Sequence, residues 1–164
     1  MKTKSVLPLV VIVICTLVAF SCNKPTQTPL SVEERTNIED TVKHLVRLVE
    51  KGANERDLDI SFNIFSDDPD FTFSEDGYIY PPKDSLYKIF KPVYGNWSEL
   101  SLRWDTMRIV VLDRNSAVFT GAGPWSATDM EGNYMNGQVV ATYVFVNRDD
   151  KWQMLHGHAS HTFE

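Results

Sequence analysis

The sequence predicts one α+β domain whose helices cover one face of a strongly bent antiparallel sheet. Helical spacing of apolar residues dominates the first half of the 164-residue chain, whereas long β-rich runs separated by polar turns fill the second half. Hydrophobic residues make up 43% of the chain, which is enough for one core at this length. The expected element order is α-α-β-β-α-β-β-β-β.

Helical patterns occur at three places in the sequence. The first helix is expected to begin at Ser31, because Glu34 completes a capping box with it, and to end at Gly52. Its apolar stripe consists of Ile38, Val42, Leu45 and Val49. Two further helices are expected over about residues 54–65 and 83–94, each with apolar residues along one side.

Strand patterns occupy the remainder. Two short strands, residues 71–74 and 78–80, are expected on either side of Asp76-Gly77, because an Asp-Gly pair readily supplies the positive φ of a tight turn. Four long strands rich in β-branched and aromatic residues follow the third helix. They are expected at residues 98–112, 116–128, 135–146 and 151–162.

The N-terminus has the features of a secretory signal. Lys2 and Lys4 precede an apolar run over residues 6–20, which is short of the roughly 20 apolar residues that span a membrane. The run ends in Ala19-Phe20-Ser21-Cys22, which resembles the lipobox of bacterial lipoproteins, in the relaxed form of Bacteroidetes-type lipoproteins. This resemblance implies cleavage before Cys22 and a lipid on that residue. The alternatives are an ordinary signal peptide with a chance cysteine, or a retained membrane anchor.

These features divide the chain into three parts. Residues 1–21 are expected to be the signal peptide, residues 22–30 the lipidated cysteine and a polar tether, and residues 31–164 the folded domain. We expect an exported protein held at the cell envelope, periplasmic or at the outer membrane, through the lipid on Cys22 alone. Both cysteines, Cys15 and Cys22, precede the domain, so the domain has no disulfide and no thiolate metal site.

Charge and motifs exclude several functions. The formal net charge of −6 repels phosphate backbones and argues against nucleic acid as a partner. The sequence has no Gly-x-Ser-x-Gly, phosphate loop, dinucleotide fingerprint or His-Glu-x-x-His motif, so no cofactor and no metal are expected. The acidic residues around the first short strand are expected to lie in solvated turns, because their spacing does not match a calcium loop. These residues are Asp67, Asp68, Asp70, Glu75 and Asp76.

The element order and the C-terminal strand resemble the NTF2-like superfamily, and within it the SnoaL-like and DUF4440-like domains. Residues 151–160 resemble the W-x-hydrophobic-x-H-x-H-x-S ending of SnoaL-like domains and of the association domain of a calmodulin-dependent kinase. The resemblance covers about residues 31–161. It implies a cone-shaped fold with a pocket between the concave sheet face and the helices, and frequent dimers through the outer sheet face. It implies no single activity, since the fold carries isomerases, cyclases and dehydratases as well as binding and assembly domains.

His156 and His158 are the strongest candidates for chemistry in such a pocket. They are two residues apart on a strand and therefore point to one face, together with Trp152 and Met154, whereas His161 has the opposite parity. Three interpretations stay open for the pair. The histidines orient a ligand or act as acid and base, they begin a metal site that lacks further ligands, or they are structural and bonded to the backbone.

Other strand residues complete the predicted pocket. Aromatic walls suit flat apolar ligands, and an inward Arg108 would pair with a carboxylate. The alternatives are that Arg108 faces solvent and that the aromatic residues belong to the core or to a dimer interface. The predicted pocket residues are Tyr80, Trp104, Arg108, Trp125, Tyr143, His156 and His158.

Three functions follow from these expectations. The first is a lipid-anchored, non-catalytic domain that binds a small, partly apolar ligand in the cone. The second is a SnoaL-like isomerase or hydro-lyase with His158, or next His156, as general acid or base. The third is a non-catalytic dimerisation or assembly module. The expected partners are a small molecule, the membrane through Cys22, and a second copy of the chain through the sheet.

Overall fold

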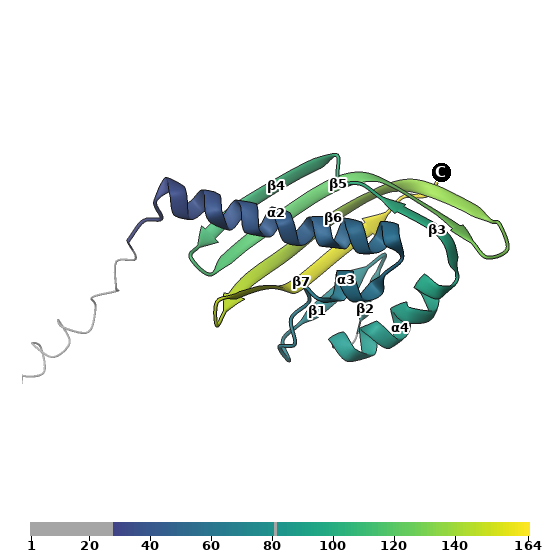
Figure 1. Ribbon diagram of the computed structural model, residues 1–164, viewed down its shortest axis with the longest axis horizontal. Coiled ribbons are helices and arrows are strands. Elements are labelled where there is room, and N and C mark those ends of the chain that lie inside the picture. The colour runs from purple at the N-terminus through teal and green to yellow at the C-terminus, as the bar shows by residue number, and fades with distance from the viewer. Residues whose placement is uncertain (1–27, 81) are drawn as a thin grey trace, which may run out of the picture.

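The computed structural model describes residues 28–80 and 82–164, in which it has helices on one side of a curved sheet. The helices are α2 (Val32–Glu55), α3 (Leu58–Phe62) and α4 (Lys83–Gly95). The strands are β1 (Thr72–Glu75), β2 (Tyr78–Tyr80), β3 (Trp97–Leu102), β4 (Thr106–Asp113), β5 (Ser116–Asp129), β6 (Tyr134–Arg148) and β7 (Lys151–His161). Figure 1 shows α2 lying lengthwise across the sheet, with α3 and α4 near its C-terminal end.

The N-terminal features of the sequence fall outside this structure. The predicted signal peptide, the predicted lipidation site at Cys22 and most of the predicted tether lie in residues 1–27, outside the described residues. Within the described ranges, no helix is both long enough and apolar enough to cross a membrane.

The strands form one seven-stranded sheet in the order β2-β1-β7-β6-β5-β3, with β4 also paired to β5. Strand β1 runs parallel to β7, with Phe73 opposite Gly157, whereas the other described pairs are antiparallel. The predicted α+β class is confirmed, but the sheet is mixed and not wholly antiparallel. The difference arises because β1 pairs with the strand that is most distant from it in sequence, and no local pattern specifies such a pairing.

Helix α2 begins as predicted and continues past its predicted end. The backbone N–H of Glu34 donates to Ser31 Oγ (3.1 Å) and that of Ser31 donates to Glu34 Oε2 (2.7 Å), which completes the capping box. The helix ends only where Arg56 adopts φ 53°. Gly52 therefore lies inside the helix. A Cβ at this position would be 2.2 Å from Ser61 Oγ, which explains why the residue is a glycine. The glycine therefore allows α3 to pack directly against α2.

The single strand predicted over residues 98–112 is interrupted. Strands β3 and β4 both pair with β5, and the three residues between them carry Trp104, which is 3% exposed, into the core. The connection crosses very close to β5, because a Cβ on Gly123 would lie 1.8 Å from the carbonyl oxygen of Arg103. A glycine at this point therefore permits the sheet to bend sharply.

The core fills the space between the helices and the concave sheet face. Leu86 from α4 and Met154 from β7 are fully buried, as are residues of α2, β5 and β6. Burial of such a side chain contributes about 1.5–3 kcal/mol. The largest fully buried residues are Phe119, Phe145, Ile64, Leu86, Met154, Val42 and Val46. They occupy part of the concave face and leave a cavity beside them.

Candidate functional site

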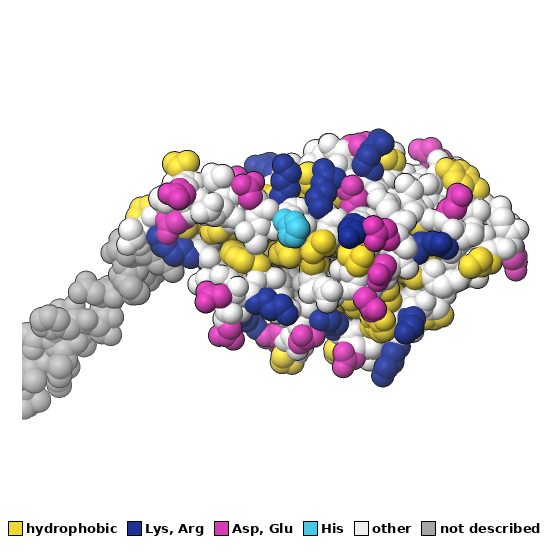
Figure 2. Space-filling model, in the orientation of Figure 1, with side chains coloured by type: hydrophobic (Ala, Val, Ile, Leu, Met, Phe, Trp, Pro, Cys, Tyr) yellow, Lys and Arg dark blue, Asp and Glu magenta, His cyan; other side chains and the backbone are white. Residues whose placement is uncertain are grey.

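A cavity of about 370 Å³ lies between the three helices and the concave face of the sheet. This size lies within the range of small-molecule sites, which are mostly apolar with a few polar groups. Its apolar wall includes Phe62, Phe65, Phe73, Leu86, Phe90, Trp97, Trp104, Trp125, Met135, Val139 and Phe163. In the space-filling view of Figure 2, apolar side chains are visible between the charged residues of α2 and those of the other helices.

One wall of the cavity carries Glu75, Asp76 and His161. Asp76 and Gly77 form the two-residue turn between β1 and β2 with φ values of 48° and 88°, as the Asp-Gly pair predicts. This turn directs the Asp76 carboxylate at the end of β7. Its Oδ1 accepts the backbone N–H of His161 at 2.7 Å, and its Oδ2 lies 2.9 Å from His161 Nδ1. An ionised carboxylate only accepts, so Nδ1 donates and Nε2 is left for another partner.

Glu75 lies on β1 beside this pair and has an unusual protonation equilibrium. Burial, and to a smaller extent the nearby Asp76, raise the pKa of the Glu75 carboxyl well above its ordinary value, to about 7, against the opposing effect of His161. Its Oε1 is 3.8 Å from His161 Nδ1. Glu75 therefore exchanges its proton near neutral pH, which is the range in which a carboxyl acts as acid or base. The expectation of a solvated turn was wrong for Glu75, because β1 packs alongside β7.

Two phenols add hydrogen-bond donors to the wall. Burial raises the pKa of Tyr94 to about 12, and burial together with the charge of Glu75 also raises the pKa of Tyr143. Both hydroxyls therefore keep their protons at neutral pH. Two more wall residues, Ser61 and Trp104, are each 3% exposed, and Ser61 Oγ and Trp104 Nε1 have no hydrogen-bond partner in the described part of the chain.

The predicted pocket residues separate into two groups. Trp104, Trp125 and Tyr143 line the cavity. Tyr80 lies outside the lining, with its ring centroid 5.4 Å from that of Phe90. Arg108 is exposed on the outer sheet face, so the inward placement is corrected: the residue alternates with Met107 and Ile109, whose side chains pack on the core.

His156 and His158 also lie away from the cavity, and the reason is a β-bulge. On β7, Met154 pairs with Phe145 and His156 pairs with Val144, so Leu155 is an extra residue opposite a single step of β6. The bulge reverses the parity of the strand. After the buried Met154, the inward residues are Gly157, Ala159 and His161, and the two histidines fall on the outer face.

His161 is the histidine of the cavity wall, and the sequence did not predict it there. The signal that points to it is the pair of small residues at Gly157 and Ala159, which alternate with the histidines. A Cβ on Gly157 would lie 2.5 Å from the ring of Phe73, so this face of β7 needs small residues beneath β1. The face with the small residues is therefore the covered one, and His161 continues it.

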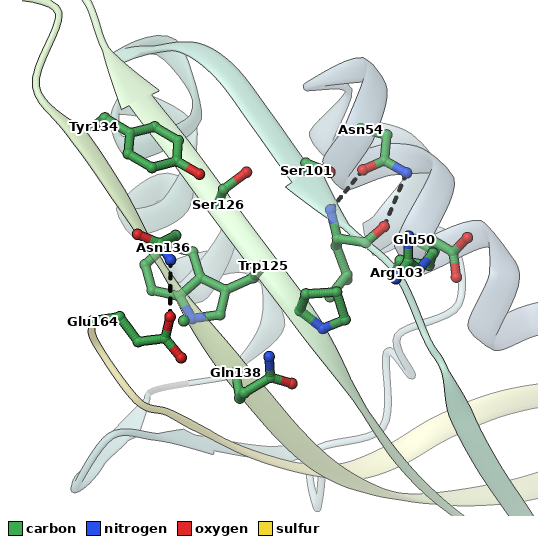
Figure 3. Close-up of a pocket in the computed structure, with 13 residues that line it drawn as sticks. Glu50, Asn54, Ser101, Arg103, Trp125, Ser126, Tyr134, Asn136, Gln138 and Glu164 are labelled. Carbon is green, nitrogen blue, oxygen red and sulfur yellow. Dashed lines mark hydrogen bonds between the residues drawn. The ribbon is translucent and has the colours of Figure 1, made fainter.

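A second hollow of about 370 Å³, drawn in Figure 3, shares Leu102 and Trp125 with the lining of this cavity. Its polar groups mostly bond to neighbouring protein groups. The Asn54 side chain donates to the carbonyl of Leu102 (3.1 Å) and accepts its N–H (2.7 Å), and Asn136 Nδ2 donates to Glu164 Oε2 (3.2 Å). We therefore place the candidate site in the apolar cavity, where fewer of the polar groups are bonded to neighbouring protein groups.

Neither hollow forms a metal centre. Across residues 28–80 and 82–164, no three His, Cys, Asp or Glu side chains are arranged to hold a metal ion. The titratable groups on the cavity wall are carboxyls, an imidazole and phenols.

Comparisons with known proteins agree with this fold. The NTF2-like superfamily protein from Salmonella enterica has a TM-score of 0.71 at 16% identity, with 79% of this chain and 94% of that chain covered. The hexachlorocyclohexane dehydrochlorinase LinA-type3 from Novosphingobium barchaimii gives 0.71 at 16%, covering 82% and 93%. A candidate scytalone dehydratase from Novosphingobium aromaticivorans gives 0.68 at 11%, covering 80% and 89%. At these identities the likeness shows the NTF2-like fold alone.

The sequence comparison is more specific. None of the curated proteins matches the chain. The sequence model for the SnoaL-like domain matches residues 42–164, which include most of α2, both short helices and every described strand. The chain therefore belongs to the SnoaL-like domain family and has the NTF2-like fold.

Proposed function

We propose that the domain binds a small, partly apolar molecule in the cavity between the helices and the concave sheet face. The observation that carries this proposal is the cavity itself: about 370 Å³, walled by aromatic side chains and provided with polar groups along one side. Apolar contact with a ligand contributes about 25 cal/mol per Å² removed from water, and a few fixed polar groups orient it. A module that acts only in assembly needs no such space.

A cavity-filling substitution tests this proposal. Ala127 is buried on the cavity wall, whereas Ala122 of the same strand lies on the outer sheet face, so Ala127→Leu and Ala122→Leu form a matched pair. We expect the neutral dye N-phenylnaphthylamine to bind the wild type and Ala122→Leu saturably, with a rise in fluorescence, and to bind Ala127→Leu at least about tenfold more weakly. Circular dichroism checks that both variants are folded. Equal binding by both variants, or no binding by the wild type, contradicts the proposal.

A second candidate function is an acid–base enzyme of isomerase or hydro-lyase type. The observation that favours it is Glu75, which has a pKa of about 7 and lies beside His161, a histidine that Asp76 already orients. In this proposal Glu75 and His161 have the acid–base role that the sequence predicts for His156 and His158. Conversion of a β-hydroxyketone or a β,γ-unsaturated ketone to the conjugated enone, followed by ultraviolet absorbance, tests it. Activity that survives Glu75→Gln unchanged contradicts this role.

We also propose that the domain is carried on a lipoprotein and forms a homodimer. The lipobox-like sequence at Cys22 supports export and anchoring at the cell envelope. The outer sheet face supports pairing, because Val110, Leu112 and Val140 are 40%, 59% and 50% exposed there. We also propose that the domain is DUF4440-like, as its sequence resemblance predicts.

A further inference from the structure

The charges that line the cavity are unbalanced. Glu75 and Asp76 are adjacent carboxyl groups, and the lining within the described chain contains no lysine or arginine. The basic group on the wall is His161, which is in contact with both carboxyls. Arg103, the arginine closest in sequence to the wall residue Trp104, has its guanidinium on Asp105. Charges act strongly across an apolar cavity, so a ligand here experiences a negative potential.

The aromatic wall favours the same sign of charge. Aromatic rings carry negative faces that attract cations, and tryptophan does so most strongly. Trp97, Trp104 and Trp125 all line the cavity. The ring of Trp125 lies edge-on to His161 with 5.2 Å between centroids, which brings this aromatic wall to the acidic side.

The wall also offers hydrogen-bond acceptors. Ser61 Oγ is buried without a partner within hydrogen-bond distance among the described residues and can accept from an ammonium group, whereas Trp104 Nε1 only donates and is no partner for it. Carboxyl and hydroxyl oxygens can accept the three N–H donors of an ammonium group. A carboxylate ligand would meet the phenols of Tyr94 and Tyr143 as donors, but it would also meet two like charges.

From this arrangement we propose that the cavity selects small organic cations: a protonated primary amine on an aromatic or aliphatic body, with the ammonium group against Glu75 and Asp76. The inference rests on the proposed function, because it names the ligand class of the same cavity. The body of the ligand occupies the space among the aromatic side chains, and the acidic wall sets its orientation.

The protonation of Glu75 adds a dependence on pH. An ammonium group binds the ionised carboxylate, so the affinity rises as the pH rises through about 7, the pKa of Glu75. Aliphatic amines keep their proton across this range, because their pKa is about 10. The titratable groups that face Glu75 from the neighbouring elements are Asp76, Tyr80, Tyr94, Tyr143 and His161.

Three probes with one phenylbutyl body test the inference by calorimetry on the purified protein: phenylbutylamine, phenylbutanol and phenylbutanoate. We expect the amine to bind about tenfold or more tightly than the alcohol, and the carboxylate to bind most weakly. In Glu75→Gln the amine should fall to the affinity of the alcohol, whose own affinity should not change. Glu131→Gln, in the exposed β5–β6 turn outside the cavity lining, is the matched control and should behave as wild type.

The outcomes separate this inference from the proposed function. If the alcohol binds as tightly as the amine, or the carboxylate binds best, the cation preference is overturned while ligand binding stands. If none of the three probes binds, both proposals fail. A second measurement needs no variant: between about pH 6 and about pH 8 the wild-type affinity should rise for the amine and stay level for the alcohol. A level amine profile overturns the role of Glu75 and with it the inference.

Discussion

Gly52→Ala tests whether α3 is held against α2 by direct contact at a helix glycine. An alanine Cβ would lie 2.2 Å from Ser61 Oγ and 2.8 Å from both the carbonyl oxygen of Asp57 and the backbone nitrogen of Ser61. The backbone atoms cannot rotate away, so α3 has to move. Because Ser61 and Phe62 of α3 line the cavity, the substitution also displaces part of the ligand site.

Two opposing effects set the magnitude. Replacing glycine by alanine in an unconstrained helix stabilises it by about 0.5–1 kcal/mol, whereas overpacking of this kind costs about 1–3 kcal/mol. The net expectation for Gly52→Ala is a loss of about 1–2 kcal/mol in the free energy of unfolding. Gly95, the last residue of α4, has no atom within 4 Å of such a Cβ. Gly95→Ala is therefore the matched control and should be neutral or mildly stabilising.

Urea unfolding followed by far-ultraviolet circular dichroism measures both variants. We expect a lower midpoint for Gly52→Ala, no lower midpoint for Gly95→Ala, and unchanged slopes. Adding Ser61→Ala to Gly52→Ala should recover only part of the loss, because the backbone contacts remain. If Gly52→Ala is as stable as Gly95→Ala, the close approach of α3 to α2 is refuted.

Three further predictions concern the site, the oligomer and the anchor. The raised pKa of Glu75 makes the folded state lose stability as the pH rises from 4.5 to about 7. Glu75→Gln should therefore add up to about 3 kcal/mol to the free energy of unfolding above pH 7 and little near pH 4. Thermal melts at the two pH values check this, and an equal shift at both contradicts it. Val140→Glu, on the outer face, should convert the proposed dimer to a monomer in light scattering, and a monomeric wild type contradicts the dimer. Cys22→Ser should abolish incorporation of a labelled fatty acid while Cys15→Ser retains it, and labelling that survives Cys22→Ser argues against the lipobox.

The features that could be predicted from the sequence are those fixed by neighbouring residues. The capping box of Ser31 and Glu34 and the Asp76-Gly77 turn each depend on residues within three positions of one another. Their geometry follows from side-chain hydrogen bonds and backbone preferences that act locally. The start of α2 and the β1–β2 hairpin were therefore accessible before the structure.

The features that could not be predicted depend on contacts across the fold. Glu75 lies in an acidic segment whose composition is typical of a solvated turn. Its burial follows from the parallel pairing of β1 with β7, in which Glu75 is opposite Ala159. The interruption between β3 and β4 depends on a close approach to Gly123 of β5. The face on which His161 lies depends on the extra residue Leu155. None of these contacts leaves a periodic signal in its own segment.

The bulge at Leu155 has a consequence for how residues are compared between members of the family. Every side chain of β7 beyond this position owes its face to one inserted residue. A relative with the same His-x-His letters and a regular strand would place both histidines inside its cone, where this chain places Gly157 and Ala159. Alignment of the motif alone would then equate residues on opposite sides of the sheet. Deletion of Leu155 would remove the bulge and still leave Gly157, Ala159 and His161 on the inner face, so a relative that is one residue shorter here would match this chain face for face.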